Sequence, residues 1–156
     1  MKILKKTAVT AMLLAASYLQ SVAQSSMVPL NEPNYNKPRL FSDLPEQLNL
    51  RLADMEALLN LSVGAQVTAT VANGFQLTGT VVSKSAPGNA FVETVVIKSL
   101  NRPGATFTFS RITKQDRSFL YTGRMMSKDA GDALEIVKEG SGYVIRKKGL
   151  YDLISE

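Results

Sequence analysis

The chain lacks two residue types that carry much of protein chemistry, because none of its 156 residues is cysteine or histidine. Without them it cannot form a disulfide, a usual zinc, haem or iron–sulfur site, or a nucleophilic Ser-His or Cys-His pair. The motifs G-x-S-x-G and S-x-x-K and a Gly-rich phosphate loop are also missing from the sequence. We therefore expect a protein that is not an enzyme, with no catalytic residue, no cofactor and no metal ligand.

A membrane-spanning helix is not expected either, since it needs about 20 apolar residues and the apolar run 8–19 has about a dozen. Lysines precede this run and small residues ending in Ala23 follow it, which is the pattern of a cleaved signal peptide. We expect residues 1–23 to be removed and the protein to be exported, to the periplasm or to the extracellular space. No transmembrane segment is expected after processing.

Net charge is small once the signal peptide is set aside. The full chain has 18 basic and 13 acidic residues and a formal charge of +5. Removal of Lys2, Lys5 and Lys6 leaves 15 basic residues against 13 acidic ones in the remaining 133, a net charge of +2. With 45% hydrophobic and 20% charged residues, the composition is that of one folded globular domain.

Residues 24–42 are rich in proline and asparagine, a composition that favours extended backbone without regular pairing. We expect a loosely held N-terminal arm. Docking of its scattered apolar side chains on the domain or on a partner is the alternative. The remaining residues, 43–156, are expected to form a domain of one helix followed by strands.

The helix is predicted to begin at Asp43, which forms a capping-box pattern with Glu46 and has Pro45 in the first turn. Gly64 is predicted to end it. Apolar residues then recur at steps of three and four, which places on one face Leu44, Leu48, Leu52, Met55 and Leu59. We expect this face to pack against the core of the domain.

After Gly64 the apolar residues alternate with polar ones, which predicts strands. Asn73-Gly74 predicts a tight hairpin turn of type I′. The candidate strands are 67–71, a strand starting at Phe75, 91–98, 105–112, 119–127, 133–138 and 143–147. The links between them are too short for crossover helices. We predict an all-β fold with one N-terminal helix, a small antiparallel seven-stranded meander forming a barrel or a sandwich.

The sequence 75–84 recurs as 119–128 with five of ten positions identical, and 68–71 resembles 106–109. We interpret this as two three-stranded repeats, at about 67–98 and 105–138; convergence of two hairpins is the alternative. Gly79 and Gly123 are predicted inside strands, where glycine marks a bulge or a tight bend. Gly88-Asn89 and Gly131-Asp132 are predicted as turn residues with positive φ.

Basic residues concentrate in one stretch, since 84–124 holds seven of them against two acidic residues. Aromatic side chains are interleaved with these bases, a pattern that fits a solvated face with the aromatic residues inward or a surface for an anionic glycan or an acidic protein. Export makes nucleic acid an unexpected partner. The candidate binding residues are Arg102, Arg111, Lys114, Arg117 and Arg124. The alternative is a solvated surface with no binding role.

Residues 119–148 contain the pattern F-x-x-T-G-x-x-x-S, a glycine turn and a closing hairpin with the sequence GSGYVIRK. This stretch resembles the β-hairpin-rich prodomain modules of secreted bacterial zinc metalloproteases. The resemblance implies a module that binds another secreted protein, and it identifies no site residue. Our functional hypothesis is therefore a secreted or periplasmic non-enzymatic β module that binds a protein or an anionic glycan. The alternative is a hydrolase that uses carboxylates brought together from different strands.

Overall fold

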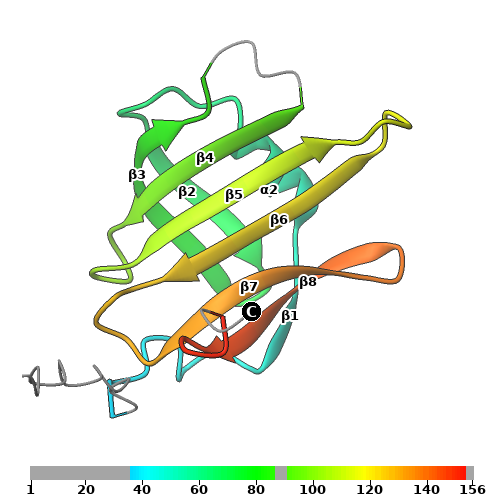
Figure 1. Ribbon diagram of the computed structural model, residues 1–156. Coiled ribbons are helices and arrows are strands. Elements are labelled where there is room, and N and C mark those ends of the chain that lie inside the picture. Colours follow the sequence, from blue (N-terminus) through cyan, green and yellow to red (C-terminus); the bar gives the residue numbers. More distant parts are fainter. Residues whose placement is uncertain (1–35, 87–90, 154–156) are drawn as a thin grey trace, which may run out of the picture. The chain divides into compact units, whose positions relative to one another are not determined.

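The computed structural model describes residues 36–86 and 91–153. In these residues one eight-stranded antiparallel sheet curls into a half-barrel around a short helix (Figure 1). The elements are β1 (Gln47–Asn49), α2 (Leu52–Leu58), β2 (Gln66–Ala72), β3 (Phe75–Lys84), β4 (Val92–Ser99), β5 (Thr106–Thr113), β6 (Phe119–Met126), β7 (Asp132–Glu139) and β8 (Gly142–Gly149). The predicted signal peptide, the first part of the predicted arm and the Gly88-Asn89 turn lie outside the described residues.

The strands are arranged in the order β1-β8-β7-β6-β5-β4-β3-β2, and every pair is antiparallel. Strands β2 to β8 therefore form the predicted meander, in which each strand pairs with the next. The predicted strand number is one too low, because β1 adds an eighth strand beside β8. A sandwich is wrong, because all of these strands belong to one sheet.

The two edge strands of the half-barrel meet at one point. Leu50, directly after β1, forms an antiparallel bridge with Ala72 at the end of β2. The N–H of Arg51 donates to the carbonyl oxygen of Val71 over 2.9 Å. Beyond this contact β2 is the last strand of the sheet, so the edge formed by residues 66–70 has no strand beside it in the described structure.

The helix is much shorter than predicted, because it begins at Leu52 rather than at Asp43. Asp43 does not cap it, since its carboxylate accepts two hydrogen bonds from Arg102 at 2.8 and 2.6 Å. The segment around Leu48 is instead strand β1, where Leu48 is buried opposite Ile145. Pairing with a distant strand has thus overridden the local helical pattern.

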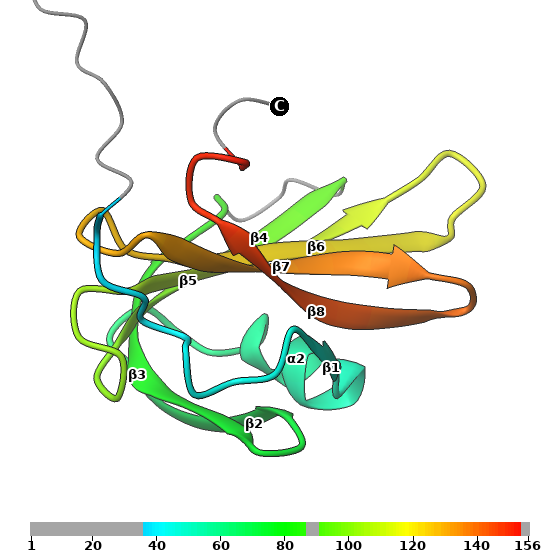
Figure 2. The ribbon, with the colours of Figure 1, turned by 90° about the horizontal axis from the view of Figure 1, so that it is seen from below.

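The core lies on the concave face of the sheet. Figure 2 shows α2 in the hollow of the curled sheet, and Met55 and Leu58 of the helix are buried there. Along each strand, buried residues alternate with exposed or half-buried ones, as expected when one face is covered. The largest fully buried side chains of the sheet are Phe109, Leu77, Ile97, Met125, Val81, Val95 and Val71.

The β2–β3 turn is located correctly by the sequence, but its type is not. Gly74 has a φ of +80°, whereas Asn73 is not among the described residues with positive φ. A type I′ turn needs positive φ at both positions, so that prediction is wrong. The register between β2 and β3 shifts between Thr70 and Ala72. A bulge of this kind bends the strand and increases its local right-handed twist.

The two predicted repeats agree in their second strands and disagree in their first. Gly79 and Gly123 both lie inside strands, where their partners are Val67 and Phe109. Val67 is therefore the structural counterpart of Phe109, whereas the sequence comparison had matched Val71 with it. The connecting turns also differ in length, two residues in the first hairpin and five in the second.

Candidate functional site

The five predicted binding residues do not share one surface. Arg102 lies in the β4–β5 turn at one end of the strands, and Lys114 and Arg117 lie in the β5–β6 turn at the other end. Strand alternation places Arg111 on the concave face, in phase with the buried aromatic residues of β5. The same alternation places Arg124 on the convex face of β6. Binding of an anionic ligand therefore stays a prediction, and the fold places the five candidate residues at separate positions on the domain.

Three of these five bases have carboxylate partners. Arg111 contacts Glu93 at 2.8 Å and Arg124 contacts Glu135 at 2.9 Å, each across neighbouring strands. Arg102 contacts Asp43. A base already paired with a carboxylate attracts a further anion less strongly. In the described structure, these three arginines therefore act as partners in ion pairs.

Residues 37–43, which we call the strap, are docked on the domain rather than loosely held. Arg102 donates to the carbonyl oxygen of Leu40 at 3.0 Å and lies over the ring of Phe41, 5.8 Å from its centroid. Asp132 is 3% exposed and accepts the N–H groups of Leu40 and Phe41 at 2.6 and 3.0 Å. The hydrogen bond from Arg102 also holds the pKa of Asp43 below its usual value.

Gly131 receives the strap through a close backbone approach. Its N–H donates to Pro38 at 2.9 Å, and a Cβ at this position would lie 2.8 Å from the carbonyl oxygen of Lys37. Gly131 does not have the positive φ predicted for it, and neither does Asp132. Sequence reasoning missed the buried acceptor role of Asp132 because its partners lie 91 and 92 positions earlier in the chain.

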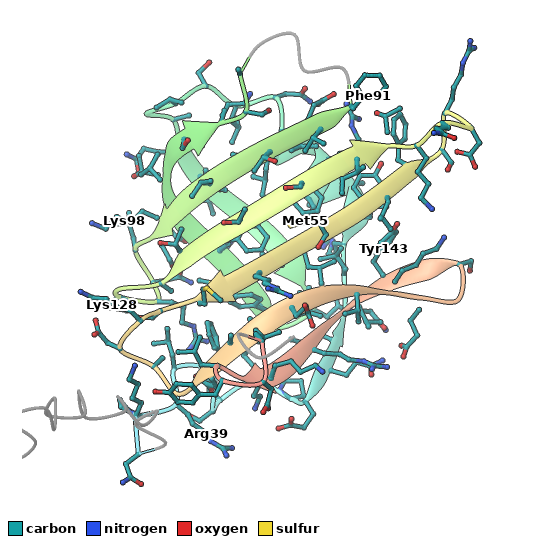
Figure 3. The ribbon with its side chains drawn as sticks, viewed as in Figure 1. Arg39, Met55, Phe91, Lys98, Lys128 and Tyr143 are labelled. Carbon is teal, nitrogen blue, oxygen red and sulfur yellow. The ribbon has the colours of Figure 1, made fainter. Side chains whose placement is uncertain are left out.

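A polar cluster lies on the concave face beside α2. The Tyr121 hydroxyl donates to Glu56 of the helix, and its ring stacks on Phe109 at 5.9 Å. Tyr143, labelled in Figure 3, meets the Tyr121 ring edge-on at 5.4 Å. Burial, followed by the hydrogen bond to Glu56, raises the pKa of Tyr121 to about 12. The nearby guanidinium of Arg111 acts in the opposite direction.

This pKa predicts an alkaline loss of stability. An unfolded tyrosine ionises near pH 10, so Tyr121 favours the folded state fully below that pH and loses this contribution as the pH rises through about 12. We expect the unfolding free energy of the wild type to fall more steeply between pH 10 and 12 than that of Tyr121→Phe. Urea titrations of both proteins at pH 9, 10.5 and 11.5 measure the difference. Parallel curves would contradict the assignment.

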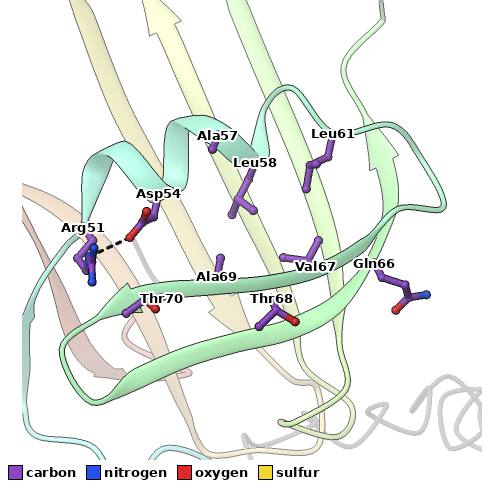
Figure 4. Close-up of a pocket in the computed structure, with 10 residues that line it drawn as sticks. All are labelled: Arg51, Asp54, Ala57, Leu58, Leu61, Gln66, Val67, Thr68, Ala69 and Thr70. Atoms are coloured by element: carbon purple, nitrogen blue, oxygen red, sulfur yellow. Dashed lines mark ion pairs between the residues drawn. The ribbon is translucent and has the colours of Figure 1, made fainter.

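A groove of about 410 Å³ separates one face of α2 from the free edge of β2 (Figure 4). On the helix side its lining residues recur every three or four positions, which is one face of a helix. On the strand side five consecutive residues line it. Because neighbours in a strand point to opposite faces, this means that the groove follows the edge of the strand. The lining residues are Arg51, Asp54, Ala57, Leu58, Leu61, Gln66, Val67, Thr68, Ala69 and Thr70.

The backbone of β2 is directed into this groove at alternate residues. Thr68 pairs with Thr78 of β3. The N–H of Thr78 donates to the Asn101 side chain at 3.0 Å, and its carbonyl oxygen accepts from Leu100 at 2.8 Å, both on the β4 side. The Thr68–Thr78 pair is therefore not hydrogen-bonded, and Thr68 directs its own N–H and C=O away from β3. The edge of β2 thus presents unpaired backbone groups.

One end of the groove is polar, and apolar side chains line it further along. At the end nearest the Leu50–Ala72 bridge, Arg51 and Asp54 form an ion pair at 2.8 Å. Further along, Leu58 and Val67 supply buried apolar surface. Strand β2 contains no charged residue and no proline, which are the usual means of protecting an edge. The absence of charged residues from the first strand of the meander is the sequence feature that could have indicated this site.

Among residues 36–86 and 91–153 no group of three or more acidic side chains is gathered as a metal would require. No helix in the same residues is long and apolar enough to cross a membrane. The chain matches no protein-family model, no curated protein and no solved structure. The candidate site therefore rests on its own geometry.

Proposed function

We propose that the protein binds an extended segment of another protein, which adds as a strand to the free edge of β2. The observation that carries the proposal is the orientation of Thr68, whose N–H and C=O face the groove beside α2. In strand addition the main-chain hydrogen bonds supply affinity, and pockets for alternate side chains supply specificity. The apolar surface at Leu58 and Val67 supplies such a pocket.

Two further points favour a protein ligand. Three of the bases that suggested an anionic glycan are paired with carboxylates, so the geometry supports a neutral extended ligand better. The resemblance of residues 119–148 to secreted prodomain modules also implies a protein partner. We propose binding rather than hydrolysis because the strand carboxylates Glu93, Glu135 and Glu139 each contact an arginine. We place the encounter outside the cytoplasm, on the signal-peptide pattern of residues 1–23.

The test is a substitution that blocks the edge without touching the core. Proline at position 68 removes the outward N–H and is tolerated at a free edge. Peptides selected from a phage-displayed library of random nine-residue sequences on the wild type should bind Thr68→Pro at least about tenfold more weakly. Fluorescence polarisation measures the affinities, and Thr68→Val, which keeps the N–H, is the matched control with unchanged binding.

Two outcomes would overturn the proposal: no peptide is enriched on the wild type, or the enriched peptides bind Thr68→Pro as tightly as the control. If Thr68→Pro fails to fold, Thr70→Lys provides the second variant, because a lysine on an edge strand disfavours pairing. Far-UV circular dichroism of each variant establishes that it is folded.

A further inference from the structure

The edge of β2 that is open to a guest strand has a defined length and a defined phase. Thr68 directs its backbone groups away from β3, and because this orientation recurs at every second residue, Gln66 and Thr70 do so as well. Past Thr70 the edge is occupied by the chain itself, since the N–H of Arg51 donates to the carbonyl oxygen of Val71. A guest can therefore lie beside five residues of β2, from Gln66 to Thr70.

Only two residues of such a guest face the helix. Residues that lie side by side in neighbouring strands direct their side chains to the same face of a sheet. Val67 and Ala69 lie on the concave face, where Val67 belongs to the core and Ala69 packs against it. Thr68, between them, is exposed on the convex face. The guest residues beside Val67 and Ala69 therefore direct their side chains toward α2, whichever way the guest runs.

The helix presents different surfaces to these two guest side chains. Figure 4 shows Ala57 of the helix above Ala69 of the strand, so that an alanine lies on each side of the groove at this point. Further along the groove, the larger side chain of Leu61 lies above Val67. More space is therefore left between Ala57 and Ala69 than beside Val67.

We infer that the guest places a large apolar side chain between Ala57 and Ala69 and a small side chain beside Val67. This inference rests on the proposed function and names the chemistry of the partner, an extended segment with these two residues two positions apart. A leucine, methionine or phenylalanine beside Ala69 buries its own apolar surface and that of Ala57, which is otherwise exposed. A large side chain beside Val67 meets Leu61 and overfills the groove.

Filling the space from the helix side tests the inference. The probe is the tightest peptide selected on the wild type from the nine-residue library, together with variants in which each large apolar residue is replaced by alanine. One of these replacements should weaken binding to the wild type at least about tenfold. Ala57→Leu should bind the selected peptide at least about tenfold more weakly than the wild type does, and should bind that alanine variant as tightly as the wild type does. Fluorescence polarisation measures the four affinities of this double-mutant cycle.

Ala53→Leu is the matched control, because Ala53 is an exposed alanine of the same helix and does not line the groove. It should bind both peptides as the wild type does. If circular dichroism shows that Ala57→Leu is not folded, Ala69→Val fills the same space from the strand side, where a β-branched residue is well tolerated. The same coupling to the large guest side chain is expected of it.

Failure of the inference and failure of the proposed function give different results. If Ala57→Leu binds the selected peptide as tightly as Ala53→Leu does, or weakens both peptides equally, the inference is overturned. Strand addition stands in that case as long as Thr68→Pro still weakens binding. If Thr68→Pro binds as tightly as the wild type, the proposed function is overturned, and the inference with it.

Discussion

Replacing Phe41 by alanine should lower the free energy of unfolding by about 3–5 kcal/mol, the usual loss for a fully buried phenylalanine. Phe41 precedes every strand and lies in a proline-rich stretch, yet it is 0% exposed and belongs to the main hydrophobic cluster. Its N–H is held by Asp132 and its ring lies under Arg102. Removing the ring leaves a cavity between the strap and the sheet. Urea denaturation at pH 7 measures the loss.

Phe119→Ala provides the matched control for this prediction. Phe119 is also aromatic, but it is 47% exposed at the start of β6. The guanidinium of Arg111 lies over its ring, 4.8 Å from the ring centroid. Truncating this side chain to alanine should lower the free energy of unfolding by about 1 kcal/mol, because much of its surface is in contact with water in the folded state. Equal losses for the two variants would show that the strap is not part of the folded core.

Alanine at Gly79 or at Gly123 should each destabilise the domain by about 1–3 kcal/mol, the usual cost of inserting volume into a packed interior. A Cβ at Gly79 would lie 2.5 Å from the carbonyl oxygen of Lys98, and one at Gly123 would lie 2.7 Å from that of Thr108. Both obstacles are backbone atoms of a paired neighbouring strand, so they move only if the ladder itself distorts.

Gly142→Ala is the control for the two strand glycines. Its Cβ would meet nothing nearer than the carbonyl oxygen of Glu139 at 3.9 Å. We expect its melting temperature to match that of the wild type or to rise slightly, because alanine restricts the unfolded chain. Thermal unfolding followed by circular dichroism measures all three variants. A stable Gly79→Ala or Gly123→Ala protein would contradict the close strand approach.

The strands were predictable from sequence to a much greater extent than the helix. Alternation of apolar and polar residues located β2 to β8 because each pairs with its neighbour in the chain, so that local pattern and tertiary contact agree. Leu48 satisfied both a helical and an extended pattern. Its conformation is decided by Ile145 of β8, a partner that no local window contains. The missed strand and the late helix start have this same cause.

The candidate site was harder to predict because it depends on what is absent beside a strand. Counting charges identified Arg102 and Arg111 as candidate residues. It could not identify their partners Asp43 and Glu93, because that requires knowing which strands and loops are adjacent. The free edge of β2 follows from the meander order, once the first strand is known to have no partner before it. The groove itself requires the position of α2, which the sequence placed too early.

The order of pairing has a consequence for how the domain forms during synthesis. The first strand, β1, pairs with the last, β8, and the strap is held by Asp132 at the start of β7. A chain that leaves the ribosome N-terminus first can pair β2 to β6 progressively, since these are contacts of low sequence separation. Until the C-terminal hairpin has been made, the strap lacks its hydrogen bonds to Asp132, and β1 lacks its strand partner. Arrival of this hairpin therefore determines when the growing chain becomes resistant to proteases.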